Sequence, residues 1–306
     1  LKQGLSLNEY GFSGEGRIPE VHDEAGIYKA LGLDCPAPEL RENRGEVEAA
    51  DAGTLPSLVE LENLRGTFHN HTTASDGHAT LEEMAEAAIE LGLRYLGIAD
   101  HSKASFQANG LDEERLARQV GMIREWNEKR GDELWLFAGS EVDILKDGTL
   151  DFDDATLARL DYAVASVHAS FTLDEKAMTK RIIRAMENEH VTMLGHLTGR
   201  LLLRRDEYAV NHEKIIDCAA RTRTIIELNC NPYRLDMDWR WWHKARDLGV
   251  ICSINPDAHR PEQLQFLRFG IGIARKGWLR RADVLNTFPL DKVRDFLATP
   301  KAQRKL

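Results

Sequence analysis

The chain has 306 residues, of which 42% are hydrophobic and 29% are charged, and this composition is typical of a soluble globular protein. A formal net charge of -10 argues against a generally basic nucleic-acid surface, although a local basic patch or a bound cation can still attract phosphate groups. The four cysteines are far apart and form no CxxC pair, which argues against a thiolate zinc site and against a disulfide framework.

The ends and the apolar runs of the chain bear on its location. No secretory signal segment opens the sequence, and no run of 18 apolar residues occurs within it. Together these observations predict a cytoplasmic protein. Because the first residue is Leu rather than Met, we expect the chain to be part of a longer protein.

Residues 1–65 form a mixed segment with no evident core of its own. The stretch "DEAGIYKALG" predicts a helix over residues 23–32, and "PSLVELENL" predicts a second short helix over residues 56–64. A Pro-containing stretch, "CPAPELRENRGE", lies between them. We expect this segment to be a lead-in that packs on its neighbour or joins another domain.

From Gly66 onward, short β-branched or apolar runs alternate with helical patterns. Thr80 and Glu83 form a capping box for a helix over residues 80–92, and further helices are predicted over residues 111–131 and 235–249. This alternation predicts a parallel α/β barrel with one strand fewer than the usual eight. The seven predicted strands are residues 66–68, 95–99, 135–140, 162–167, 191–195, 225–230 and 250–254.

Residues that can bind metal ions follow six of these seven strands. In such a barrel the residues just past each strand lie on the carboxyl-terminal face, where the chemistry of the fold takes place. Alternate residues of a strand share a face, so a His-x-His pair such as "HNH" can direct both imidazoles at one ion. The nine candidate ligands are His69, His71, Asp76, His101, Glu141, His168, His196, Asp257 and His259.

Nine ligands exceed what one or two ions need at about four protein ligands each, so we infer a cluster of three divalent ions. Imidazole and carboxylate ligands suit Mn, Zn or Fe, and the sequence does not select among these metals. Such ions lower the pKa of bound water and neutralise charge on a phosphoryl group. Metal-assisted hydrolysis of a phosphoester is therefore the leading reaction class.

Individual members of this set have other interpretations. Asp76 in "SDG" also suits the cap of a turn, and His196 also suits a histidine of the core. Asp100 and Asp143 lie beside candidate ligands and are expected to be structural partners or to orient imidazoles rather than to bind ions. The remaining histidines are expected at the surface: His22, His78, His190, His212 and His243.

At these residues the sequence resembles the PHP (polymerase and histidinol phosphatase) superfamily. The motifs "HNH", "SDG", "ADHS", "SEVDI", "SVH", "GH" and "DAH" occur in order across residues 66 to 290. Within the superfamily, "DHSKAS", "ANGLDEERL", "EVDILKDGTLD", "GHLTGRLL", "ELNCNPYRLD" and "GIGIARKGWL" are similar to the C-terminal PHP domain of bacterial family X DNA polymerases. The lead-in resembles the end of the polymerase thumb and the connector that follows it.

The resemblance implies a distorted seven-stranded, TIM-like (β/α)7 barrel over residues 66–306, preceded by a connector over residues 1–65. It implies a first metal held by His69, His71, Glu141 and Asp257, a second shared by Glu141 with His168 and His196, and a third held by Asp76, His101 and His259. We expect His71, Glu141 and Asp257 to be the catalytic members of this set.

Two positions depart from the expected pattern. Leu197 stands where Pro is expected after "GH", and Asn255 and Pro256 stand where Ser and Thr are expected before "DAH". Neither change removes a ligand. Pro256 fixes its own φ and lacks an N–H beside Asp257, which bears on the geometry of that carboxylate.

Three cations in loops after ligand-bearing strands are candidates for substrate binding, namely Lys103, Arg200 and Arg205. The guanidinium fork of Arg suits phosphate. Exposed charge that only favours solubility is the other interpretation of each. The expected partners are single-stranded DNA or DNA 3' ends, or a small phosphoester, together with polymerase domains on the N-terminal side and no membrane.

Three functions remain open on the sequence alone. The resemblance to family X polymerases favours a manganese-dependent 3'-5' exonuclease or another phosphoesterase acting on DNA ends. A phosphatase of small phosphomonoesters, like the histidinol phosphatase branch, is a second possibility. The third is a non-catalytic, metal-bound domain that supports a polymerase, and the complete ligand set disfavours it.

Overall fold

The computed structural model describes residues 4–14 and 20–305, and the chain divides into two compact units between Ser57 and Leu58. The helix predicted over residues 23–32 is confirmed as α1. The first unit contains β1 (Leu5–Asn8), β2 (Gly11–Gly14), α1 (Glu24–Ala30) and α2 (Glu46–Ala52).

The short helix predicted over residues 56–64 forms only in part. Only a 3-10 turn, Leu61–Asn63, forms there, and the backbone N–H of Glu60 donates to the side-chain oxygen of Asn63 at 3.0 Å. Before the turn, the extended residue Leu58 forms a β-bridge with Arg280. The local side-chain bond and the bridge both hold the backbone out of the α-helical conformation.

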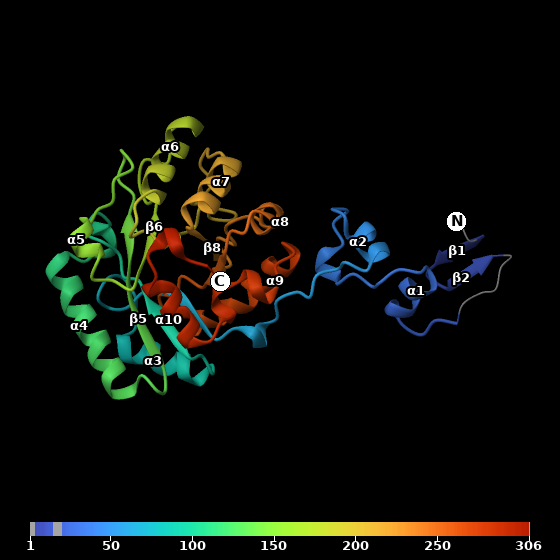
Figure 1. Cartoon of the computed structure of the whole chain (residues 1–306), viewed down its shortest axis with the longest axis horizontal. Coiled ribbons are helices and arrows are strands. Elements are labelled where there is room, and N and C mark those ends of the chain that lie inside the picture. The colour runs from blue at the N-terminus through green and yellow to red at the C-terminus, as the bar shows by residue number, and fades with distance from the viewer. Residues whose placement is uncertain (1–3, 15–19, 306) are drawn as a thin grey trace. The chain divides into compact units, whose positions relative to one another are not determined.

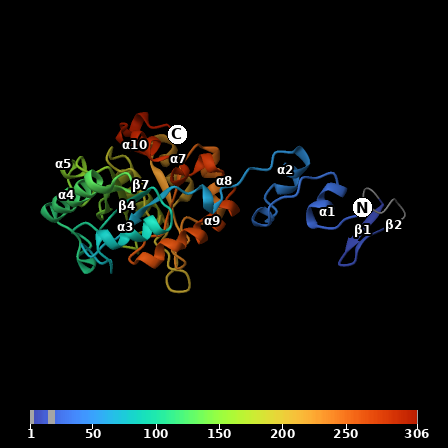
Figure 2. The same cartoon turned by 90° about the horizontal axis from the view of Figure 1, so that it is seen from below.

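Residues 58–305 contain a seven-stranded parallel sheet, and all seven predicted strands are confirmed. The strands are adjacent in chain order and curve into a nearly closed barrel, with helices between successive strands on the outside (Figures 1 and 2). The strands are β3 (Gly66–Asn70), β4 (Tyr95–Ile98), β5 (Trp135–Asp143), β6 (Tyr162–Ser166), β7 (Met193–Leu194), β8 (Ile225–Asn229) and β9 (Cys252–Asn255). The α-helices are α3 (Leu81–Glu90), α4 (Glu113–Arg130), α5 (Asp154–Leu157), α6 (Glu175–Met186), α7 (His212–Thr222), α8 (Trp239–Asp247), α9 (Leu267–Lys276) and α10 (Leu290–Ala298).

The first and last strands meet at the seam of the barrel. Asn70 and Ala258 form an isolated parallel bridge, and the His71 N–H donates to the carbonyl of Ala258 at 2.8 Å. Lower on the seam, the Thr67 hydroxyl donates to the carbonyl of Ile254 at 3.0 Å. These contacts bring the end of β3 next to the end of β9, although the two strands have no regular ladder.

Aromatic side chains fill the barrel at the amino-terminal ends of its strands. The rings of Phe68 and Tyr162 have centroids 5.0 Å apart and meet edge to face, and both side chains are fully buried or nearly so. A Cβ atom at Gly97 would lie 2.5 Å from the Phe68 ring, and one at Gly139 would lie 2.4 Å from the Tyr162 ring, so glycine at both positions admits these rings. The same buried cluster includes Val293, Phe296 and Leu297 of α10. The barrel is therefore filled at this end.

The outer helices follow the predicted patterns. Thr80 caps α3, and the reciprocal bonds with Glu83 measure 3.2 and 2.8 Å, which confirms the capping box. Among the described residues, no helix has the length and apolar character needed to cross a membrane.

Candidate metal centre

All nine predicted ligands gather at the carboxyl-terminal ends of the strands. Within the described residues they form four overlapping groups whose nitrogen and oxygen atoms lie within 4.8 Å of one another. The groups are His71, Asp76, His101 and His259; His69, His71 and Asp257; His69, Glu141 and His196; and His101, Glu141 and His168. None of the five histidines predicted at the surface belongs to these groups.

Glu141, on β5, lies at the centre of the cluster. Its Oε1 is 3.3 Å from Nε2 of His69, 3.2 Å from Nε2 of His168 and 2.8 Å from Nε2 of His196. Its Oε2 is 2.9 Å from Nδ1 of His101 and 3.7 Å from Nε2 of His71. One buried carboxylate therefore contacts five imidazoles, which agrees with the role of a ligand shared between ions.

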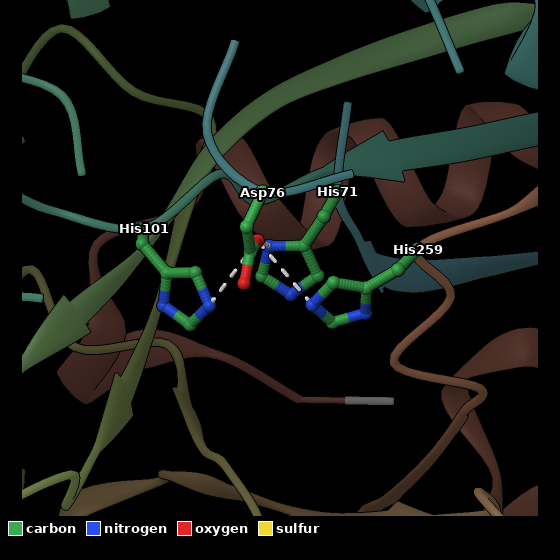
Figure 3. A group of neighbouring side chains, drawn as sticks. All are labelled: His71, Asp76, His101 and His259. Carbon is green, nitrogen blue, oxygen red and sulfur yellow. Dashed lines mark ion pairs between the residues drawn. The ribbon is translucent and has the colours of Figure 1, made fainter. Parts of the chain in front are cut away.

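Asp76 lies between two histidines at the mouth of the site. Its Oδ1 is 3.6 Å from Nε2 of His101 and 3.3 Å from Nε2 of His259, as the dashed lines in Figure 3 mark. The ring of His71 stacks on those of His101 and His259, with centroids 4.5 and 4.2 Å apart. Asp76 therefore faces the cluster and does not serve only as a turn cap.

Two ligands have a left-handed backbone conformation. His69 has φ 57° and Asp257 has φ 52°, in a region that His and Asp enter more readily than most residues. The register of β3 with β4 shifts between Thr67 and Asn70, so His69 and His71 approach one another through an irregularity and not along a regular strand. After Pro256, Asp257 turns its Oδ1 to within 3.2 Å of Nε2 of His71.

Several buried ring nitrogens have no hydrogen-bond partner among the described residues. Among the ligands these are Nε2 of His69, both ring nitrogens of His71, Nδ1 of His101 and Nδ1 of His196. Buried polar atoms are rarely left unpaired without a reason, and a site for a metal ion is one such reason. Six imidazoles and three carboxylates, without cysteine, suit a divalent transition metal with open coordination positions. The residues present therefore fit metal ions.

Three histidines of the cluster have raised pKa values. Burial alone would lower the pKa of His69, but the carboxylates of Glu227 and Glu141 outweigh it and raise that pKa well above its usual value. Burial would also lower the pKa of His168, but the charge of Glu141 and hydrogen bonds with Asp143 and Glu141 raise that pKa to about 10. At His259, burial is again outweighed, here by Asp76, and the pKa rises to about 9.

The carboxylates change in the opposite direction, and His71 differs from its neighbours. Burial would raise the pKa of Glu141 and of Asp257, but surrounding histidines lower both values well below the usual range. Burial is likewise outweighed at Asp76, whose pKa falls to about 2 next to His259. Burial, with the charges of His259 and His101, lowers the pKa of His71 to about 4. The cluster is thus a compact set of ionised carboxylates with a neutral imidazole among them.

Glu227, on β8, supports the cluster from below and was not predicted. It is fully buried, and its Oε1 lies 2.6 Å from Nδ1 of His69. Oε1 also accepts from Nδ2 of Asn255 at 2.9 Å, while Oε2 accepts from the backbone N–H of His196 at 2.7 Å and from Nδ2 of Asn229 at 3.2 Å. A carboxylate at Nδ1 leaves Nε2 of His69 directed at the cluster.

Of the two aspartates expected to orient imidazoles, one does so. Asp143 places Oδ1 3.0 Å from Nδ1 of His168, as predicted. Asp100 instead accepts from the backbone N–H and the hydroxyl of Thr72, at 2.8 and 2.7 Å, and from the hydroxyl of Ser75. Asp100 is therefore a structural partner, as one of the two expectations had it, and it orients no imidazole because its short side chain reaches the loop after β3 and holds that loop in place.

The cluster opens into a cavity of about 250 Å³, and the cation that lines it is Arg234. Nε of Arg234 is 3.3 Å from Oδ2 of Asp257, and its buried Nη1 has no hydrogen-bond partner among the described residues. The cavity is therefore bordered by a guanidinium with spare donor capacity. Its lining residues are seven of the nine ligands, all but His69 and His71, together with Ser105, Gln107, Ala108 and Arg234.

The three cations predicted to bind substrate do not line this cavity. Lys103 forms an ion pair with Glu113. Arg200 donates from Nε to the carbonyl of Arg234 at 2.8 Å, and Arg205 donates to the carbonyl of Gly199 at 3.0 and 2.6 Å. Loop geometry, which the sequence does not give, directs these side chains to protein acceptors.

The sequence contains a signal for each of the two site residues that were not predicted, Glu227 and Arg234. Glu227 is a charged residue inside the otherwise apolar strand "IIELN", where an ionised side chain needs a partner. Arg234 follows that same strand and satisfies the positional criterion that selected the ligands. The strand before it, β8, carries none of the nine ligands, whereas the cations predicted to bind substrate all follow ligand-bearing strands.

The chain matches two protein-family models and a relative of known name. A family model described as "PHP domain" matches residues 67–231, and one described as "DNA polymerase beta thumb" matches residues 1–42. The chain is 40% identical over 298 residues to the DNA polymerase/3'-5' exonuclease PolX of Bacillus subtilis (strain 168), an alignment that covers 97% of this chain and 52% of PolX. The chain thus spans about half the length of that relative.

Shorter proteins are also similar. A probable phosphatase of Thermoanaerobacter sp. (strain X514) is 28% identical over 246 residues, covering 76% of this chain and 94% of that protein. A solved structure from Listeria monocytogenes, named as a histidinol phosphatase, superposes with a TM-score of 0.53 at 17% identity and covers 65% of this chain and 97% of its own. That likeness concerns the fold alone. Because the matched PHP segment contains the strands β3 to β8 and carries seven of the nine clustered ligands, the chain belongs to the PHP domain family.

Proposed function

We propose that this chain hydrolyses phosphoesters with the help of divalent metal ions, and that its substrate is a DNA end, cleaved in the 3'-5' direction. The central observation is the contact of one buried carboxylate, Glu141, with five imidazoles beside a cavity bordered by Arg234. Such a site combines cation ligands with a donor for a substrate oxyanion.

The proposed ligands divide into three sets, two of which share Glu141. The first comprises His69, His71, Glu141 and Asp257, the second Glu141, His168 and His196, and the third Asp76, His101 and His259. Divalent ions at such a site polarise a phosphoryl oxygen and lower the pKa of bound water. Their identity, among Mn, Zn and Fe, and their number are part of the proposal.

The residues of the chain have separate tasks in this proposal. His71, Glu141 and Asp257 are the catalytic ligands, because each faces the centre of the cluster. Glu227 fixes the ring of His69 from below. Arg234 binds the phosphoryl group through its unpaired Nη1, and it takes the role that the sequence suggested for Lys103, Arg200 and Arg205.

DNA is proposed as the substrate for two reasons. The relative in Bacillus subtilis carries exonuclease activity in its name and aligns with nearly the whole of this chain. The segment before the barrel matches a polymerase thumb, so residues 1–65 are proposed as a connector to polymerase domains.

A phosphatase of small phosphomonoesters is the second candidate. The similarity to probable phosphatases that consist of little more than this barrel favours it. A non-catalytic domain that supports a polymerase is the third, and it predicts bound metal without hydrolysis of any phosphoester.

The test is manganese-dependent digestion of a 5'-labelled single-stranded oligonucleotide, with Asp257→Ala beside the wild type and metal content measured for both. A ladder shortened from the 3' end, absent in the variant, would support an exonuclease at this site. Hydrolysis of p-nitrophenyl phosphate without a ladder would favour the small-substrate phosphatase. A metal-loaded wild type that hydrolyses neither would refute the proposed activity.

A further inference from the structure

Exposed aromatic side chains are few on the barrel unit, and two of the three described ones are next in sequence to residues that line the metal cavity. Among the described residues from 58 onward they are Phe106, Tyr233 and Phe269, with 75%, 53% and 37% of each residue exposed. Phe106 immediately precedes the cavity-lining residues Gln107 and Ala108, and Tyr233 immediately precedes Arg234. Phe269, on α9, adjoins no residue of the cavity.

The turn that carries Phe106 is held firmly by its own hydrogen bonds. Phe106 opens a 3-10 turn, Phe106–Ala108, that ends at Asn109 in a left-handed conformation. Nδ2 of Asn109 donates to the carbonyls of Ala74 and Ser75 at 3.3 and 3.2 Å, and Ser105 donates to Asp143 at 2.5 Å. The turn is thus tied to the loop of Asp76 and to the partner of His168, so the backbone that carries Phe106 has a defined position near the cluster.

The turn that carries Tyr233 is fixed in a similar way. The Tyr233 N–H donates to the side chain of Asn231 at 3.0 Å, and the Tyr233 carbonyl accepts from the N–H of Leu202 at 2.6 Å. The guanidinium of Arg204 lies over the Tyr233 ring, 4.6 Å from its centroid. An exposed cation therefore accompanies the exposed ring.

The two rings belong to different sides of the barrel. Phe106 lies in the connection after β4 and Tyr233 in the connection after β8. In the sheet, β5, β6 and β7 separate these strands on one side, and β3 and β9 separate them on the other. The two aromatic residues therefore lie in separate loops on different sides of the barrel, and each is next in sequence to a residue that lines the cavity.

We propose that Phe106 and Tyr233 are stacking platforms for bases of a single-stranded nucleic acid whose phosphoester lies at the ligand cluster. Arg204 then meets the sugar-phosphate backbone next to Tyr233. This inference rests on the proposed function, and it adds that the site recognises the nucleosides on either side of the reacting ester. Bases stack on aromatic side chains with little regard to sequence, and rigid rings lose little entropy on binding.

The alternative of rings exposed without function is disfavoured by their position. An apolar ring in water forgoes the free energy of burial, and apart from Phe269 the other described aromatic side chains of the barrel are buried or partly buried. Exposure of two rings on rigid turns, each next in sequence to a cavity residue, is what a ligand with π-faces requires. A small phosphomonoester without a base would use neither ring.

The test compares two oligonucleotides of equal length with manganese-loaded protein. One is oligothymidylate, and the other has abasic residues in its last two 3' positions, which keep the backbone and remove the bases. Wild type, Phe106→Ala and Tyr233→Ala are compared with the matched control Phe269→Ala, by kcat/KM for 3' shortening and by fluorescence anisotropy for binding. All three replaced side chains are exposed, so folding is expected to survive.

We expect the wild type to prefer the base-bearing strand, and each of Phe106→Ala and Tyr233→Ala to lose between about fivefold and a hundredfold in kcat/KM on that strand only. Phe269→Ala should match the wild type. Equal cleavage of both strands by the wild type, or equal losses on both strands in the variants, would overturn the stacking role while leaving the proposed hydrolysis intact. Hydrolysis of p-nitrophenyl phosphate with neither strand cleaved would overturn the DNA substrate and the stacking role together.

Discussion

Replacing Glu227 with Gln keeps the size of the side chain and removes one negative charge beneath the ligand cluster. In the folded protein both carboxylate oxygens accept two hydrogen bonds each, from His69 and Asn255 at Oε1 and from the His196 N–H and Asn229 at Oε2. An amide offers only one acceptor oxygen. In either orientation its NH2 group therefore faces two donors.

The magnitude follows from that mismatch. A buried donor left without its acceptor costs about 1–3 kcal/mol, so we expect Glu227→Gln to lower the free energy of unfolding of the metal-free protein by at least this amount. Residues that hold metal-binding imidazoles typically contribute about 10–100-fold to affinity, which corresponds to about 1.4–2.7 kcal/mol. The Kd of the ion bound by His69 should rise accordingly.

Metal affinity is measured by isothermal titration with Mn²⁺ and by metal content after dialysis against graded chelator. Glu133→Gln is the matched control, since Glu133 is an exposed carboxylate paired with Arg130 at 2.8 Å. Urea unfolding of the metal-free proteins gives the stability change. A Kd for Glu227→Gln within twofold of the wild type would refute the assigned role of Glu227 in holding His69.

Three further outcomes are expected. Glu141→Gln should lose at least two of the bound ions, because the carboxylate contacts ligands of every proposed set, and a metal-to-protein ratio equal to that of the wild type would contradict a shared ligand. Arg234→Ala should raise KM for a phosphoester about tenfold or more without loss of metal, while Arg205→Ala, whose guanidinium binds the Gly199 carbonyl, should change neither value. In metal-free protein the pKa values of His168, about 10, and His259, about 9, exceed the unfolded value of about 6.5. The stability that these two protonated histidines contribute is fully present below pH 6.5 and is lost as the pH rises through 9 to 10. The Tm measured with chelator should therefore fall over that range more than the Tm of the metal-loaded protein. Parallel pH profiles of the two Tm values would contradict this.

The strands and the ligands were predictable because both follow from simple repeats. Seven apolar runs, each followed by a helix, specify a parallel barrel, and the carboxyl ends of parallel strands share one face. Side chains such as His101 and His168 therefore converge without any knowledge of the angles between strands. The ligand set depends only on sequence position relative to the strands.

Features that depend on loop conformation were not predictable. Arg200 and Arg234 both follow ligand-bearing or supporting strands, yet one binds backbone carbonyls and the other borders the cavity. The left-handed φ of His69 leaves no trace in residue type, because the residue is not glycine. The strands β1 and β2 have 4 residues each, which is too short for an alternating apolar pattern to show in the sequence.

The aromatic filling of the barrel has a consequence for turnover. Phe68 and Tyr162 close the interior beneath the cluster and α10 covers that end, so the barrel is a cup and not a channel. A nucleic-acid strand therefore cannot pass through the interior of the barrel. Whatever ester is cleaved, both products leave by the opening through which the substrate entered, and a released phosphate-bearing product competes there with the next substrate molecule.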